Sequence, residues 1–202
     1  SAYHPDTTFD ENCICQRGDG SILMLMRISD GIAYSESTDG GATWSEAARY
    51  CVPSPSARMY LGKFPTGEFF LIHHYNFTKR NNMAVMLSHD EGRSYDEVLM
   101  LDERTSVAYP DAFVDGDGKV YAVYDRERYG DKEIQLAVFR LEDILAGHCV
   151  TPGARTKGIV CKALGARRTE EEKRAGTLWP RKYCDPLRPP TTQLDQYFKS
   201  FV

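Results

Sequence analysis

Residues 37–44 read Ser-Thr-Asp-Gly-Gly-Ala-Thr-Trp, and residues 88–95 read Ser-His-Asp-Glu-Gly-Arg-Ser-Tyr. Both follow the pattern Ser-x-Asp-x-Gly-x-[Ser/Thr]-aromatic. An Asp side chain that caps its own turn, followed by a Gly free to adopt positive φ, predicts a tight link between two antiparallel strands. The aromatic residue at the end can pack beneath the turn and anchor it. Two copies 51 residues apart indicate a repeat architecture.

A second periodic signal comes from three glycine turns, at Gly20, Gly67 and Gly118, which are 47 and 51 residues apart. Each turn leads into an apolar run that reads as a strand, and a further strand follows it. The predicted strands are residues 21–26, 31–37, 68–73, 83–88, 119–124 and 133–139. A unit of about 45–50 residues with four short antiparallel strands is typical of a β-propeller blade. A sandwich would show turns every 8–12 residues without this long period, so we predict an all-β propeller.

The repeats divide the chain into two parts, with about three blades in residues 1–165 and a tail in residues 166–202. Propellers have about four to eight blades. The chain is therefore predicted to be the C-terminal part of a larger ring, or to take its missing blades from another chain. The tail contains a charge run and several prolines, and its role is left open between a short helix over 193–202 and a disordered segment.

Composition excludes several functional classes. The 202 residues carry a net charge of -4, which argues against a nucleic-acid partner. No apolar run approaches the ~18 residues that a membrane helix needs, and no signal peptide is visible. We therefore expect a soluble protein of unassigned location, with no membrane partner.

Cysteine spacing argues against a disulfide scaffold and against a zinc site, because no Cys-x-x-Cys pair is present. We expect buried or half-buried free thiols, with Cys13 and Cys15 on one face of a strand. No metal and no cofactor are predicted. The six cysteines are Cys13, Cys15, Cys51, Cys149, Cys161 and Cys184.

Four residues in order along the chain, Glu11, Arg27, Arg80 and Tyr109, join the two Asp-turns in a larger pattern, with spacings of 16, 53 and 29 residues. The Asp-turns resemble the Asp-box (BNR) repeats of the sialidase, or neuraminidase, superfamily. The order Glu, Arg, Arg, Tyr resembles the catalytic order of that family. The resemblance covers about residues 6–145 and implies a six-bladed propeller of sialidase type, of which this chain supplies about three blades.

The resemblance implies that Tyr109 is a nucleophile, that Glu11 is its base, and that Arg27 and Arg80 hold the substrate carboxylate. The residue types suit this chemistry, because guanidinium groups grip a carboxylate bidentately and stay charged. A carboxylate nucleophile would be repelled by the carboxylate of a sialic acid, whereas a neutral Tyr is not. A phenol is a weak acid and needs a neighbouring base.

The chain also departs from the family pattern. Sialidases use a further Arg and an Asp acid/base from their first blades, and neither occurs here in a suitable context. Three further arginines, Arg58, Arg126 and Arg128, could contact an acidic sugar or form ion pairs between blades. Asp39 and Asp90 lie in the Asp-boxes, which occupy the far rim in the family, so we expect them to be structural.

The sequence therefore predicts a sialidase-like exo-glycosidase fragment that acts on terminal sialic acid or a related acidic sugar. Without the N-terminal blades the fragment is expected to be inactive or nearly so. Two alternatives stay open. One is a non-catalytic carbohydrate-binding propeller, and the other is a different enzyme of acidic glycans on the same fold, such as a lyase.

Overall fold

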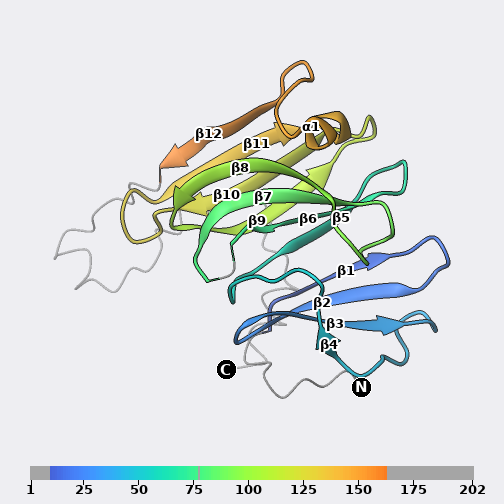
Figure 1. The fold of residues 1–202 in the computed structure, drawn as a ribbon. Coiled ribbons are helices and arrows are strands. Elements are labelled where there is room, and N and C mark those ends of the chain that lie inside the picture. The colour runs from blue at the N-terminus through green and yellow to red at the C-terminus, as the bar shows by residue number, and fades with distance from the viewer. Residues whose placement is uncertain (1–9, 77, 163–202) are drawn as a thin grey trace, which may run out of the picture. The chain divides into compact units, whose positions relative to one another are not determined.

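The computed structural model describes residues 10–76 and 78–162, which form three four-stranded antiparallel sheets (Figure 1). The first sheet contains β1 (Asn12–Gln16), β2 (Ile22–Ile28), β3 (Gly31–Ser37) and β4 (Ala48–Arg49). The second contains β5 (Tyr60–Lys63), β6 (Phe69–His74), β7 (Asn81–Ser88) and β8 (Glu97–Thr105). The third contains β9 (Val107–Val114), β10 (Val120–Arg126), β11 (Glu133–Phe139) and β12 (Arg155–Lys162). The predicted all-β class is confirmed, and the predicted tail lies outside the described residues.

The same turn joins the first two strands of every sheet. In the first sheet Arg17 N–H donates to the Ser21 carbonyl at 2.8 Å, and Gly20 N–H donates to the Arg17 carbonyl at 3.1 Å. The other two sheets repeat this pair of hydrogen bonds around Gly67 and Gly118. All three glycines have positive φ, which a side chain at these positions would disfavour. The period seen in the sequence is therefore a period of the structure.

Successive sheets pack through their faces and through their first strands, since β1 contacts β5 and β5 contacts β9. Strand β6 is buried along its whole length because it lies between two layers of side chains. The core between the first and second sheets is built from Leu23, Leu25, Ile32, Met59, Leu61, Phe69, Leu71 and Met86. The larger core between the second and third sheets includes Phe70, Ile72, Val85, Leu87, Leu101, Val120, Ala122, Tyr124 and Phe139.

The two Asp-boxes form the predicted turns, the first between β3 and β4 and the second between β7 and β8. Asp39 accepts the N–H and the hydroxyl of Thr43 at 2.8 and 2.6 Å. Asp90 accepts the same two groups of Ser94 at 2.8 and 2.7 Å. Hydrogen bonds from Thr43 and Ser37 lower the pKa of Asp39 to about 2. Slight burial raises the pKa of Asp90, but its hydrogen bonds outweigh this and lower it to about 2.

The second Asp-box also joins two sheets. Gly92 has φ of 88°, and a Cβ added to it would lie 2.8 Å from Leu23 of the first sheet. Its carbonyl accepts the Tyr50 hydroxyl at 2.6 Å, and the neighbouring Glu91 carbonyl accepts Arg17 Nε at 3.1 Å. Only glycine combines this backbone conformation with so close an approach.

The third sheet has a helix, α1 (Leu141–Ala146), where the other two have an Asp-box. The sequence has no Asp-turn motif after β11, and it predicted neither the helix nor β12. Buried Asp143 accepts the N–H groups of Val150 and Thr151 at 2.6 and 2.8 Å, and the Thr151 hydroxyl at 2.6 Å. The carboxylate therefore makes the contacts of an Asp-box to a threonine eight residues away instead of four.

The five described cysteines are free thiols, as predicted. Cys13 and Cys15 lie half-buried on one face of β1, against the core. The expected burial is wrong for Cys51, Cys149 and Cys161, which are exposed because they lie in the link after β4, after α1 and on edge strand β12. Within the described ranges, no helix has the length and apolar character to cross a membrane.

Candidate active site

Glu11, Arg27 and Tyr109 form one hydrogen-bonded group, although Glu11 and Tyr109 are 98 residues apart. The Tyr109 hydroxyl donates to Glu11 Oε1 at 3.0 Å, and Arg27 Nη1 donates to Glu11 Oε2 at 2.8 Å. Glu11 and Arg27 come from the first sheet, and Tyr109 comes from β9 of the third. Packing of the sheets therefore assembles these three predicted site residues.

The pairing of Glu11 with Arg27 follows from the β1–β2 hairpin. Asn12 is opposite Met26 in the antiparallel register, so the residues just beyond them, Glu11 and Arg27, also face each other. Arg27 N–H donates to the Glu11 carbonyl at 3.0 Å, which extends the ladder by one step. The 16-residue spacing in the sequence is therefore the length of one hairpin.

Tyr109 lies in a β-bulge. Asp111 pairs with Val123 and Ala108 pairs with Asp125, so Tyr109 and Pro110 together oppose the single residue Tyr124. Tyr109 has φ of 55°, which is unusual for an aromatic residue and costs about 1–3 kcal/mol. Bulges of this kind redirect a side chain, and residues with such strain cluster at functional sites. The bulge supports a functional role for the tyrosine.

The surroundings of Glu11 keep it ionised. Partial burial raises the pKa of the carboxyl group, but hydrogen bonds from Arg27 and Tyr109 and the charges of Arg27 and Arg80 outweigh it. The net effect lowers the pKa below the usual 4.5. Glu11 is thus a carboxylate at neutral pH, held against a phenol hydroxyl whose proton it can accept.

Two further guanidinium groups lie beside the ring of Tyr109. The Cζ atom of Arg80 is 6.0 Å from the ring centroid, and that of Arg128 is 4.0 Å from it. Arg80 precedes β7 and donates to the Ser56 carbonyl at 3.4 Å. Arg27 Nε donates to the Ser56 hydroxyl at 3.1 Å. Ser56 thus contacts both arginines of the predicted clamp.

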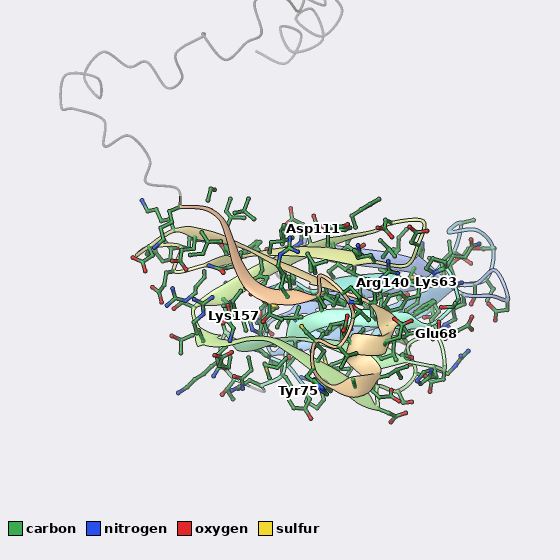
Figure 2. All side chains as sticks on the ribbon, turned by 90° about the horizontal axis from the view of Figure 1, so that it is seen from above. Lys63, Glu68, Tyr75, Asp111, Arg140 and Lys157 are labelled. Atoms are coloured by element: carbon green, nitrogen blue, oxygen red, sulfur yellow. The ribbon has the colours of Figure 1, made fainter. Side chains whose placement is uncertain are left out.

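The remaining two predicted residues make ion pairs elsewhere. Arg58 pairs with Asp111 at 3.6 Å, at the surface where Figure 2 labels Asp111. Arg126 pairs with Glu133 at 3.0 Å and with Asp131 at 3.8 Å. The structure therefore brings together Glu11, Arg27, Arg80 and Tyr109, while Arg58 and Arg126 bind carboxylates of the third sheet.

Sequence reasoning missed Ser56 and the position of Arg128. A single serine in a link carries no motif, so no sequence signal identifies it. Arg128 was one of three arginines with no assigned contact, and its stacking on Tyr109 depends on the loop after β10. His73 and His74 are buried nearby, and burial lowers their pKa values to about 3 and about 4, so both are neutral.

Comparison with known proteins identifies the family of the chain. Residues 11–122, more than half of the chain, match the family model of the BNR repeat-like domain. The chain belongs to this BNR repeat family. The Asp-box resemblance seen in the sequence is thereby confirmed, and the matched residues include Glu11, Arg27, Arg80 and Tyr109.

The chain is similar to two solved structures. The first is the intramolecular trans-sialidase from Ruminococcus gnavus in complex with oseltamivir carboxylate, with a TM-score of 0.55 and 19% identity over 70% of this chain and 34% of that one. The second is a protein of unknown function from Dyadobacter fermentans, with a TM-score of 0.48 and 15% identity over 71% of this chain and 42% of that one. The chain thus spans less than half of either protein. A comparison with curated proteins found no match.

Proposed function

We propose that this BNR repeat chain carries the nucleophile side of a sialidase-type active site, within a six-bladed propeller. The substrate would be a glycoside of sialic acid or of a related acidic sugar. The observation that carries the proposal is the hydrogen-bonded group of Tyr109, Glu11 and Arg27, drawn from two sheets and centred on a strained tyrosine. The shared fold with a trans-sialidase supports it as an analogy.

In the proposed reaction the Tyr109 oxygen attacks the anomeric carbon, and the bond from that carbon to the leaving oxygen breaks. The phenol proton passes to Glu11 over the 3.0 Å hydrogen bond. Arg27 and Arg80 both donate hydrogen bonds to Ser56, and they hold the substrate carboxylate and so orient the anomeric carbon. Water then releases the sugar from the tyrosine.

The leaving oxygen needs a proton, and none of the residues assigned above supplies it. In the sialidase resemblance this proton comes from an Asp of the first blades. The proposal is therefore limited to half of a site, and turnover of ordinary glycosides is expected only from a protein that includes the other half.

The proposal is tested by hydrolysis of an aryl α-sialoside by the full-length protein that contains this chain. Tyr109→Phe should lower kcat by more than about 10³-fold because it removes the nucleophile. An aryl β-glucuronide, assayed in parallel, shows whether another acidic sugar is preferred. Hydrolysis of either substrate at the wild-type rate by the Tyr109→Phe variant would refute the assignment.

A carbohydrate-binding protein without catalysis is the second candidate. It is favoured by the ion pair between Glu11 and Arg27, which could serve a purely structural purpose. In that case the full-length protein would bind sialic acid without turnover, and Tyr109→Phe would leave the dissociation constant unchanged.

A further inference from the structure

A cleft of about 380 Å³ opens beside Tyr109, and of its lining residues only Arg80 was assigned to the site predicted from the sequence. Its walls come from three segments, which are the residues before β7, the β8–β9 turn and the loop after β10. The lining residues are Lys79, Arg80, Asn81, Thr105, Ser106, Ala108, Asp125, Glu127, Arg128 and Tyr129. The cleft reaches the nucleophile region because Ala108 precedes Tyr109, and because Arg80 and Arg128 both face the tyrosine ring.

Arg128 is held in a fixed position in this cleft. Its Nε and Nη2 donate to Asp125 Oδ2 at 2.8 and 2.5 Å, and its guanidinium stacks over Tyr109. The adjoining residue Glu127 has φ of 52°; its N–H donates to the Ser106 carbonyl, and its carbonyl accepts the N–H groups of Gly130 and Lys132. Even so, 42% of the Arg128 side chain stays exposed to the cleft and the solvent. A fixed guanidinium loses little entropy when it binds an anion.

The charges of the cleft favour an anion. Lys79, Arg80 and Arg128 contribute three positive charges against the carboxylates of Asp125 and Glu127. The ion pair between Arg128 and Asp125 cancels one charge of each sign, which leaves Lys79 and Arg80 against Glu127 and a net charge of +1. Guanidinium groups recognise planar or tetrahedral oxyanions through paired hydrogen bonds.

We propose that this cleft is a second subsite, in which Lys79 and Arg128 bind an oxyanion of the substrate other than the carboxylate held by Arg27 and Arg80. Arg80 lines both sites. The natural substrate then carries two negative groups, such as a disialyl unit or a sulfated acidic sugar. The sharing of one substrate between the two sites rests on the proposed function, whereas anion binding by the cleft does not.

The test is isothermal titration calorimetry on the full-length protein with three probes: sodium sulfate, N-acetylneuraminic acid and α2,8-linked disialic acid. The variants are Arg128→Gln and the matched control Arg155→Gln, which removes an exposed arginine whose Nη1 donates to the nearby Gly153 carbonyl. In the wild type, disialic acid should bind about tenfold more tightly than the single sugar. Arg128→Gln should abolish that gain and weaken sulfate binding, and Arg155→Gln should change neither.

The outcomes separate the two proposals. The subsite is refuted and the proposed function stands under two joint results. N-acetylneuraminic acid and disialic acid bind with the same affinity, and Arg128→Gln leaves the affinity for sulfate unchanged. If sulfate binding depends on Arg128 while neither sugar binds, the cleft is an anion site and the proposed function fails. A gain for disialic acid that survives in Arg128→Gln also overturns the subsite. Thermal unfolding of both variants checks that each is folded.

Discussion

Two groups in this molecule contain the same three residue types, a carboxylate, an arginine and a tyrosine. In one, Glu11 accepts from Arg27 and Tyr109. In the other, Asp102 accepts from Arg104 Nε and Nη2 at 2.8 and 2.6 Å and from the Tyr124 hydroxyl at 3.1 Å. Both join two sheets, and Tyr124 is the residue that faces the bulge at Tyr109.

The two groups differ in access and in strain. Asp102 and Tyr124 are 0% and 2% exposed, and the Asp102–Arg104 pair is local to β8. The Glu11 side chain is 20% exposed, and Tyr109 has a strained backbone beside an open cleft. A buried, satisfied carboxylate stabilises the packing of sheets, whereas an accessible one that holds a strained tyrosine is available for chemistry. Residue type alone does not separate the two roles.

The largest expected effect is on catalysis by the Glu11 group. Glu11→Gln in the full-length protein should lower kcat by about 10²–10⁴-fold, because the amide cannot accept the phenol proton. A change in the other group, Tyr124→Phe, should leave kcat unchanged. Steady-state kinetics on an aryl α-sialoside give both values, and an equal loss in the two variants would remove the distinction drawn above.

The next effect concerns stability, for which the Asp102 group is expected to matter more than it does for catalysis. Asp102→Asn should lower the free energy of unfolding by about 3 kcal/mol, because half-buried Arg104 loses its bidentate carboxylate partner and keeps only the 3.9 Å contact with Glu133. The neighbouring exposed change, Glu103→Gln, removes only the surface ion pair with Lys157 of β12 (Figure 2) and should cost less than about 1 kcal/mol. Urea denaturation measures both. Similar midpoints for the two variants would mean that Asp102 is not structural.

A smaller loss is expected from the second Asp-box. Asp90→Ala frees the N–H groups of Arg93 and Ser94 and should destabilise the protein by about 1 kcal/mol. Asp39→Ala should cost less, because among the residues that the structure describes only the second box docks on a neighbouring sheet, through Gly92. Thermal unfolding of the two variants compares them directly, and the reverse order would show that the docking contributes nothing.

The smallest expected effect is a shift in pH dependence. Catalysis needs ionised Glu11, so activity should be lost as pH falls through its lowered pKa, at a pH below 4.5. Arg27→Gln removes the hydrogen bond and the charge that lower this pKa, and should move the acid limb to higher pH. The pH profile of kcat/KM reports the limb of the free enzyme. If the acid limb of the Arg27→Gln profile stays at the wild-type pH, the titrating group is not Glu11.

The order of Glu11, Arg27, Arg80 and Tyr109 along the chain, which resembles that of sialidases, predicted the four residues that the structure brings together. Glu11 and Arg27 face each other because a hairpin of known register separates them, and the Asp-boxes follow from local turn chemistry. The bulge at Tyr109 and the stacking of Arg128 depend on contacts between β9, β10 and the loop after them, which leave no local pattern. Asp143 was not predicted for a similar reason, since it lies within helix α1 and is eight residues from Thr151 instead of the four of an Asp-box.

The central claim is that Tyr109, and not Tyr124, is a nucleophile activated by Glu11. A 2,3-difluoro sialic acid tests it on the 202-residue chain itself, because fluoride leaves without a proton and the reaction needs no general acid. Mass spectrometry of the digested protein should find a sugar adduct on the peptide that contains Tyr109, and Glu11→Gln should suppress it. An adduct on another residue, or none on Tyr109 in a folded chain that binds the reagent, would contradict the account.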